Sequence, residues 1–211
     1  MKKALIWGGE GGIGRAILEE FKDQGWQVAV VARKITGRSA GADWSFEADF
    51  RDSNQVDEVV SALRGMNLGF DVFVYAGGDI TSEKVRDSDP ALWARILDNN
   101  LTAVYQTVRG SLPLLSEQAH LFLLGAVSER LQLPGLSSYA AAKAGLEAMA
   151  VTLSKEERRK KVTVVRPGAV DTSLWDKVPF NQPAHAYQPE QVADKIWNAY
   201  QEEHQGQLDL T

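Results

Sequence analysis

The feature that most constrains the fold of this chain is a regular alternation of short apolar runs with amphipathic stretches. The runs are rich in β-branched and aromatic residues and are apolar at almost every position; they cover residues 4–7, 27–32, 71–76, 120–126 and 161–166. Such runs are typical of parallel strands whose two faces are both covered by other elements. Residues 42–49 and 206–210 are weaker candidates for additional strands.

The stretches between these runs have helical periodicity. The first places Ile13, Ile17 and Phe21 on one face and stops at Gly25, which is a good C-terminal signal. The others cover residues 53–65, which open with a possible Ser53 cap, and 89–112, 137–160 and 188–203. This order predicts an α/β, doubly wound Rossmann fold in which a parallel sheet of six to seven strands carries helices on both faces. The 211 residues fit a single domain.

Composition excludes several classes of function. The absence of cysteine removes disulfides and thiolate chemistry, and the three scattered histidines show no metal-ligand spacing, so we expect no metal site. The formal net charge of −5 argues against nucleic acid as a partner. No window approaches the ~18 consecutive apolar residues of a membrane span, and the apolar start is too short for a signal peptide. The expected protein is therefore cytoplasmic, with no membrane partner.

A glycine-rich turn, "GGEGGIGRAI", follows the first predicted strand directly. A turn of this kind between a strand and a helix lets a nucleotide pyrophosphate approach bare backbone and the positive end of the helix dipole. Two registers fit: Gly9, Gly11 and Gly14 match G-x-G-x-x-G, whereas Gly8, Gly12 and Gly14 match G-x-x-x-G-x-G. Either register predicts a dinucleotide site.

The end of the second predicted strand bears on which dinucleotide is bound. Sites for NAD usually place a carboxylate there to hold the ribose 2′-hydroxyl. Here the strand ends in Ala32 and is followed by Arg33 and Lys34, so no carboxylate is present to repel a 2′-phosphate. Arg33 is placed to pair with that phosphate. We therefore expect NADP(H) to be preferred over NAD(H), unless Arg33 is simply a solvated loop residue.

Tyr139 and Lys143 are four residues apart, so they share one face of a predicted helix. A phenol with the reference pKa of ~10 is a poor base at neutral pH, and a nearby ammonium favours the phenolate. The pair suits proton transfer, although Tyr-x-x-x-Lys also occurs in ordinary amphipathic helices.

Taken together, these motifs resemble the short-chain dehydrogenase/reductase family over essentially the whole chain. The resemblance is carried by Gly8-x-x-x-Gly12-x-Gly14, Ala48-Asp49, "DNNLT" at 98–102, Tyr139-x-x-x-Lys143 and "RPGAVDT" at 166–172. It implies an NAD(P)(H)-dependent oxidoreductase that transfers hydride to or from a small carbonyl, alcohol or imine-like substrate.

The resemblance also implies a role for each matching residue. Tyr139 would be the general acid or base, Lys143 would grip the nicotinamide ribose and depress the tyrosine pKa, and Asn100 would anchor a water. Asp49 would hydrogen-bond the adenine. The remaining positions would contact other parts of the cofactor; they are Gly8, Gly12, Ile13 and Gly14 for the pyrophosphate, Ala76 and Gly77 for the adenosine, and Pro167, Gly168, Val170 and Thr172 for the nicotinamide amide.

Three positions depart from the family pattern. Trp7 stands where the family usually has Thr, and "VYAGG" replaces Asn-Asn-Ala-Gly after the fourth run. The catalytic serine position, about thirteen residues before the tyrosine, is Ala126. Ser128 lies two residues later and would share its face if the strand continued, so it is a candidate replacement. Losing one such hydrogen-bond donor costs on the order of 10² to 10³ in rate.

These departures keep two alternatives open. Ala126, the "AGG" sequence and the hydrophobic residue that opens the glycine turn resemble the dihydropteridine reductase branch, whose electron-poor substrate accepts hydride readily. Ala126 and the missing asparagines also fit a nucleotide-binding sensor with weak turnover.

The resemblance further implies a substrate lid and self-association. The lid falls at about 173–190, where Trp175, Phe180 and Tyr187 would either line a pocket or act as core anchors. The small-residue helices at about 90–112 and 137–158 imply a homodimer or homotetramer.

Overall fold

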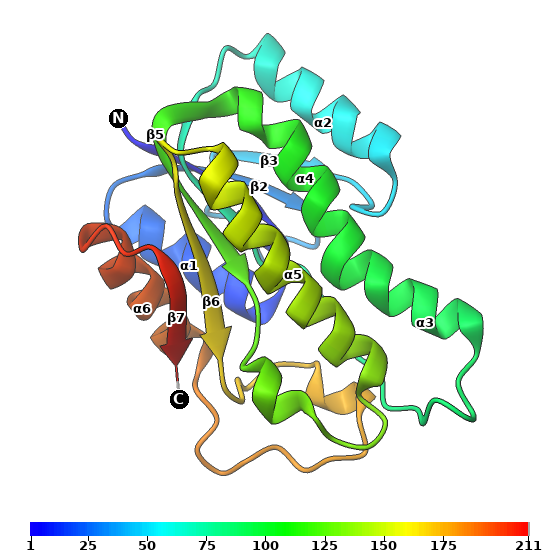
Figure 1. The fold of residues 1–211 in the computed structure, drawn as a ribbon. Coiled ribbons are helices and arrows are strands. Elements are labelled where there is room, and N and C mark those ends of the chain that lie inside the picture. Colours follow the sequence, from blue (N-terminus) through cyan, green and yellow to red (C-terminus); the bar gives the residue numbers. More distant parts are fainter. Residues whose placement is uncertain (211) are drawn as a thin grey trace.

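The computed structural model describes residues 1–210, apart from the side chains of Ser128 and Arg130. Its strands form one parallel sheet with the order β3-β2-β1-β4-β5-β6-β7, which confirms the predicted fold class (Figure 1). The strands are β1 (Lys3–Trp7), β2 (Gln27–Ala32), β3 (Trp44–Glu47), β4 (Phe70–Tyr75), β5 (Leu115–Leu124), β6 (Lys161–Pro167) and β7 (Gly206–Leu210). Both weaker strand candidates, in residues 42–49 and 206–210, therefore belong to the sheet.

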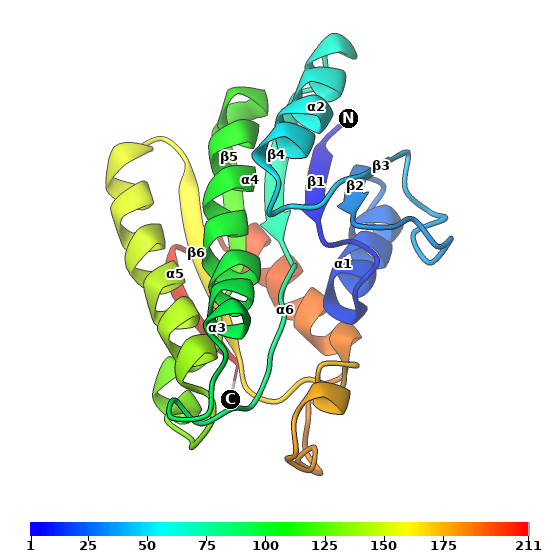
Figure 2. The ribbon, with the colours of Figure 1, turned by 90° about the vertical axis from the view of Figure 1, so that its right-hand side faces the viewer.

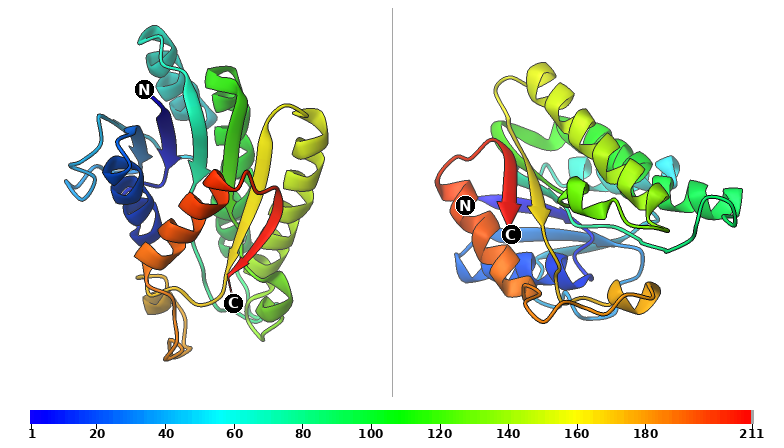
Figure 3. Two further views of the ribbon diagram at one scale, coloured as in Figure 1. Left: turned by 90° about the vertical axis from the view of Figure 1, so that its left-hand side faces the viewer. Right: turned by 60° about the horizontal axis from the view of Figure 1, so that its bottom comes forward.

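Helices cover both faces of this sheet. They are α1 (Gly12–Asp23), α2 (Ser53–Gly65), α3 (Pro90–Leu97), α4 (Ala103–Ser111), α5 (Ser137–Glu156) and α6 (Pro189–Gln201). Helices α1 and α6 pack on one face and α2, α4 and α5 on the other (Figure 2; Figure 3, right). Successive strand residues point to opposite faces, so in β1 Leu5 and Trp7 enter one core layer while Ala4 and Ile6 enter the other.

The strand order reverses between β1 and β4, and this reversal creates the crevice in which ligands of such sheets bind. The turn after β1 and the loop after β4 meet there, since the Ala76 amide donates to the Trp7 carbonyl oxygen at 2.7 Å. Residues 171–188 lie beyond the same carboxyl edge of the sheet, as the orange segment at the bottom of Figure 1. The fold thus places the glycine-rich turn, the β4 loop and the predicted lid at one edge.

The long helix predicted over residues 89–112 is interrupted. Residues Asp98–Thr102 form a π-helical turn (η1), in which the Ala103 amide donates to the carbonyl oxygen of Asp98, five residues back. Such turns are rare and occur inside otherwise regular α-helices, so the sequence analysis predicted one continuous helix. Turns of this kind are frequent at functional sites.

Three predicted boundaries also differ from the structure. Strand β5 begins at Leu115 rather than at residue 120. The sequence analysis missed its first half because that half is polar and partly exposed. Helix α2 is capped by the Asp52 carboxylate, which accepts from the Asn54 amide, and not by Ser53. Helix α5 ends at Glu156.

Candidate active site and nucleotide pocket

The glycine-rich turn leaves no room for side chains at three positions, Gly8, Gly9 and Gly14. Gly8 has a φ of +103°, and a Cβ there would lie 2.7 Å from the Ala76 carbonyl carbon; at Gly14 it would lie 2.2 Å from the Gly8 oxygen. A Cβ at Gly11 would meet only that oxygen, at an ordinary 3.4 Å. A Cβ at Gly9 would lie 2.4 Å from the Val30 side chain, so each register has a crowded first glycine and the close contacts do not choose between them. Helix α1 begins at Gly12, and its first N–H groups have no partner within the helix.

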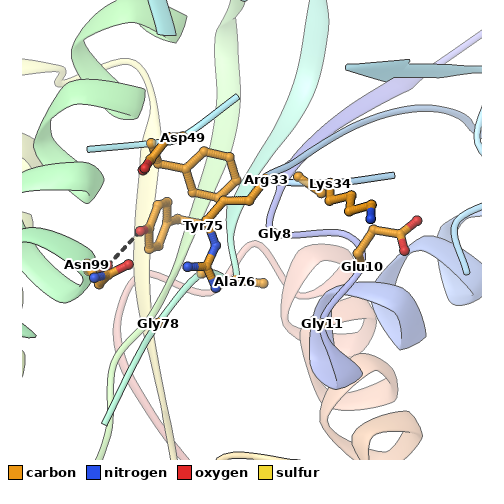
Figure 4. Close-up of a pocket in the computed structure, with 13 residues that line it drawn as sticks. Gly8, Glu10, Gly11, Arg33, Lys34, Asp49, Tyr75, Ala76, Gly78 and Asn99 are labelled. Carbon is orange, nitrogen blue, oxygen red and sulfur yellow. Dashed lines mark hydrogen bonds between the residues drawn. The ribbon is translucent and has the colours of Figure 1, made fainter. Parts of the chain in front are cut away.

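A pocket of about 310 Å³ opens beside this turn. Its walls come from the ends of β1, β2 and β4, with Asp49, Tyr75 and Asn99 on one side and Glu10 and Gly11 on the other (Figure 4). Five predicted cofactor residues line it, namely Gly8, Arg33, Asp49, Ala76 and Gly77. The other predicted cofactor residues lie outside its lining; these are Gly12, Ile13 and Gly14 on α1, Tyr139 and Lys143 on α5, Pro167 at the end of β6, and Gly168, Val170 and Thr172 after it.

Charges of both signs line this pocket. Arg33 and Lys34 are exposed and stand directly after β2. Glu10, which the sequence analysis did not single out, accepts hydrogen bonds from the amides and hydroxyls of Thr36 and Ser39. Burial raises the pKa of Glu10, but these hydrogen bonds outweigh that effect and lower it to about 2. A charged residue inside a glycine-rich turn was the signal that could have identified it.

Two further residues shape the side of the pocket where the sequence predicts adenosine contacts. The carboxylate of Asp49 accepts hydrogen bonds from Nε and Nη2 of the Arg51 guanidinium, which lower the pKa of Asp49. Tyr75 stands where the family pattern has asparagine; it is buried, and its hydroxyl donates to the Asn99 carbonyl oxygen at 2.8 Å. Tyr75 therefore ties the end of β4 to the π-helical turn.

Tyr139 and Lys143 occupy the first two turns of α5. The ammonium of Lys143 lies 5.5 Å from the centre of the Tyr139 ring and donates to the Leu124 carbonyl oxygen at 2.8 Å. Burial raises the pKa of Tyr139 to about 12 and lowers the pKa of Lys143 to about 8. The pKa of Tyr139 is thus raised rather than depressed, because desolvation of the phenolate dominates at this site.

Asn100 is fully buried in the π-helical turn. Its Nδ2 donates to the carbonyl oxygens of Ile96 (2.9 Å) and Asp79 (2.7 Å), and its Oδ1 accepts from the Asp79 amide at 3.4 Å. The side chain therefore fixes the loop after β4 to the helix that faces α5.

The strand before Tyr139 ends earlier than the sequence suggested. Strand β5 stops at Leu124 and Ser128 opens a 3₁₀ turn (η3, Ser128–Leu131), so the continuation assumed for Ser128 is wrong; its side chain lies outside the described part of the structure. Ala126 is buried, and its carbonyl oxygen accepts from the guanidinium of Arg166 at 3.4 Å.

The segment after β6 leads into the predicted lid. Val170 and Tyr187 form a parallel bridge that closes the base of this segment, and the Trp175 indole donates to the Val170 carbonyl oxygen at 2.8 Å. Tyr187 packs against the core, whereas Phe180 is only partly buried. The Thr172 methyl group would lie 3.1 Å from a Cβ at Gly12, so the start of the lid packs against the first turn of α1.

Residues 1–210 contain no cluster of three or more metal-ligating side chains. No helix in this range has the length and apolar character needed to cross a membrane. The site is therefore built from backbone, hydroxyl, amide and charged groups at the carboxyl edge of the sheet.

The family model of short chain dehydrogenases matches residues 2–182, which is most of the chain. The chain belongs to the short-chain dehydrogenase family.

Among curated proteins, this short-chain dehydrogenase is 26% identical over 205 residues to an uncharacterized oxidoreductase of Staphylococcus epidermidis, covering 92% of the chain and 89% of that protein. It is also 26% identical over 211 residues to the D-beta-hydroxybutyrate dehydrogenase of Rhizobium meliloti, covering 92% and 82%.

Solved structures show the same fold. The alcohol dehydrogenase of Thermococcus sibiricus, complexed with 5-hydroxy-NADP, superposes with a TM-score of 0.88 at 21% identity and covers 100% of this chain and 96% of that one. Membership of the family makes this protein an oxidoreductase of the type that binds NAD(P), and the cradle of Gly8 and Gly14 fits that cofactor.

Proposed function

We propose that this protein reduces a small carbonyl or imine-like compound with a nicotinamide cofactor, and that Tyr139 is its general acid. The observation that carries the proposal is the pairing of Tyr139 with the buried Lys143 at the end of β5. With a pKa near 12, the phenol keeps its proton at neutral pH, so it is ready to donate it to a developing alkoxide.

Tyr139, Lys143 and Asn100 have different roles in the proposed reaction. The nicotinamide supplies the hydride when it is bound. Tyr139 donates its hydroxyl proton to the substrate oxygen, and the Lys143 ammonium stabilises the phenolate that remains. Asn100 keeps the β4 loop in place beside α5. In the direction of alcohol oxidation Tyr139 would act as the base.

The cofactor would be held in two regions. Gly8, Gly12, Ile13 and Gly14 would hold the pyrophosphate at the N-terminus of α1, and Asp49, Ala76 and Gly77 would contact the adenosine. Pro167, Gly168, Val170 and Thr172 would border the nicotinamide under the lid at about 173–190. These assignments treat residues 1–211 as one nucleotide-binding domain.

We propose that the cofactor is NADP(H) rather than NAD(H), because Arg33 and Lys34 line the pocket at the end of β2. The structural relative from Thermococcus sibiricus carries an NADP derivative, which supports the same preference. The carboxylate of Glu10 lines the same pocket but is engaged by Thr36 and Ser39.

The test is a panel of aldehydes, ketones and quinonoid dihydropterin, with NADPH and NADH, on the wild type and Tyr139→Phe. Loss of the phenolic proton should lower kcat by about 10² to 10⁴-fold without weakening cofactor binding. Tyr105→Phe, at an exposed tyrosine of α4, is the matched control and should retain wild-type rates. A Tyr139→Phe variant as fast as the wild type would exclude this role.

The buried Ala126 favours a second candidate, a quinonoid dihydropteridine reductase-like activity. Such a substrate accepts hydride without the donor that Ala126 lacks, so it should turn over faster than simple ketones. If the protein binds NADPH tightly but no compound in the panel causes the NADPH to be oxidised, the result would instead favour a nucleotide-binding sensor.

We also propose that the protein is a homodimer or homotetramer. Large hydrophobic residues stand exposed on the outer helices, namely Trp93 on α3, Tyr105 on α4 and Val151 on α5. These helices lie on the face of the sheet opposite α1 and α6 (Figure 2).

A further inference from the structure

A buried carboxylate joins three separate parts of the molecule near the active site. Asp79 follows Gly78 in the loop after β4 and is 5% exposed. Its carboxylate accepts from Nη1 of Arg95 on α3 and from Nζ of Lys177, each at 2.7 Å. Lys177 belongs to the 3₁₀ turn Trp175–Lys177 (η4) within the lid.

The backbone of the same residue holds Asn100. The Asp79 carbonyl oxygen accepts from Asn100 Nδ2 at 2.7 Å, and the Asp79 amide donates to Asn100 Oδ1 at 3.4 Å. A Cβ at the neighbouring Gly78 would lie 3.2 Å from that Oδ1, so the loop and the amide are in close contact. Asp79 thus contacts the lid through its side chain and Asn100 through its peptide groups.

The contact between Lys177 and Asp79 is the main polar tie of the lid. Among the described groups, which exclude the side chains of Ser128 and Arg130, the other hydrogen bonds of the segment 173–186 connect it to itself or to its base at Val170 and Thr172. Lys177 is 43% exposed on its side chain, whereas that of Asp79 is 7% exposed. If Lys177 moves away, the buried Asp79 carboxylate loses a charge-assisted hydrogen bond that water cannot readily replace.

We propose that Asp79 is a positioning residue that couples closure of the lid to the alignment of Asn100. When Lys177 binds the carboxylate, the lid is held over the carboxyl edge of the sheet and the β4 loop is fixed around the amide of Asn100. Arg95 supplies the second cation and anchors the carboxylate to α3. The proposal rests on the proposed function, in which Asn100 and Tyr139 serve the reaction.

The first experiment measures hydrogen exchange of the amides in residues 173–187 in the free protein and with NADPH. Asp79→Asn and Lys177→Met should each speed this exchange by on the order of tenfold, the effect of losing about 1.4 kcal/mol of closure free energy. Combining the two changes should add little, since both remove one contact. Asp176→Asn, at an exposed carboxylate on the same turn, should leave the exchange at the wild-type rate.

The second experiment separates a positioning role from a purely structural one. Lys177→Met should raise the KM for a reducible carbonyl of the panel and also lower kcat, because release of the lid loosens the β4 loop around Asn100. Asp79→Asn should have the same two effects. The dissociation constant of NADPH should stay within about threefold in both variants, because the adenosine pocket does not include either residue.

Two results would overturn the coupling. Wild-type exchange of residues 173–187 in Lys177→Met would show that the ion pair does not hold the lid; this variant alters an exposed side chain, so folding is not in question. Faster exchange in β1 and β4 as well as the lid in Asp79→Asn would show a general loss of stability. Full turnover by Tyr139→Phe would reject the proposed function alone, since the lid measurement needs no catalysis.

Discussion

Lys143 and Tyr139 lie with the lysine ammonium 5.5 Å from the centre of the tyrosine ring, at the point where β5 ends. One of the three N–H donors of the ammonium goes to the Leu124 carbonyl oxygen. That hydrogen bond fixes the direction of the side chain beneath α5. The other two donors are available, within the described contacts, for a bound ribose.

The first prediction concerns the pH dependence of carbonyl reduction. The pKa of Lys143 is lowered to about 8 by burial, and the pKa of Tyr139 is raised to about 12. The ammonium is therefore present below about pH 8 and lost above it, while the phenol stays protonated throughout. We expect kcat to be constant from pH 6 to about 7.5 and to fall above 8, as measured by steady-state rates of NADPH oxidation. A flat profile up to pH 10 would show that the charge of Lys143 is not needed.

Lys143→Met should stabilise the protein at neutral pH while abolishing activity. A lysine whose pKa falls on folding binds protons less readily in the folded state, so its burial costs stability below about pH 8 and the cost disappears as pH rises toward 10.5. The variant should gain on the order of 1–3 kcal/mol in the free energy of unfolding at pH 7. Denaturant unfolding at pH 7 and pH 10 tests this, since the difference from the wild type should shrink at the higher pH.

Arg33→Ala should weaken NADPH binding by about 10 to 100-fold and leave NADH binding nearly unchanged. The guanidinium is proposed to pair with the 2′-phosphate, and a hydrogen bond to a charged group contributes about 1.5–3 kcal/mol. Arg38→Ala is the matched control, because Arg38 belongs to the same exposed loop but does not line the pocket. Fluorescence titration gives the dissociation constants of both cofactors. If NADH binding weakens as much as NADPH binding, Arg33 does not recognise the 2′-phosphate.

Ala126→Ser should raise the reduction of simple ketones by about 10 to 100-fold. The new hydroxyl would supply the donor that stabilises the developing alkoxide. Reduction of quinonoid dihydropterin should change little, since that acceptor is already activated. Ketone rates that stay at the wild-type level would show that the buried position does not present a hydroxyl to the substrate.

Replacing two exposed apolar residues should dissociate the proposed oligomer. Tyr105 and Val151 are more than half exposed on α4 and α5, at 54% and 52%. A Tyr105→Glu, Val151→Glu double variant should run as a monomer in light scattering, whereas Met66→Glu, which alters an exposed residue after α2, should not. An unchanged mass would place the subunit contact elsewhere.

The scaffold could be predicted from the sequence because the central strands β1, β2, β4 and β6 are buried on both faces, and each therefore forms an apolar run in the sequence. Even the edge strands β3 and β7 were marked by short apolar patterns. The polar first half of β5 was not, since Leu115–Ala119 pairs with β4 only at Phe70↔Leu115, before a register shift.

The site was predicted less completely, for a physical reason. Gly8, Arg33, Asp49, Ala76 and Gly77 meet at one pocket as expected, because all of them follow carboxyl ends of strands. The grouping of Asp79 with Lys177 joins residues nearly half a chain apart, and no local pattern encodes it. Glu10 escaped notice because its partners lie in an irregular loop.

The parallel bridge between Val170 and Tyr187 has a consequence for how this protein can change. It brings the two ends of the intervening segment side by side, and the entropy of closing a loop with fixed ends rises by only about 0.6 kcal/mol when its length doubles. We therefore expect the stretch between them to tolerate insertions and deletions at little cost in stability. Changes in its length or sequence should therefore leave the seven strands undisturbed.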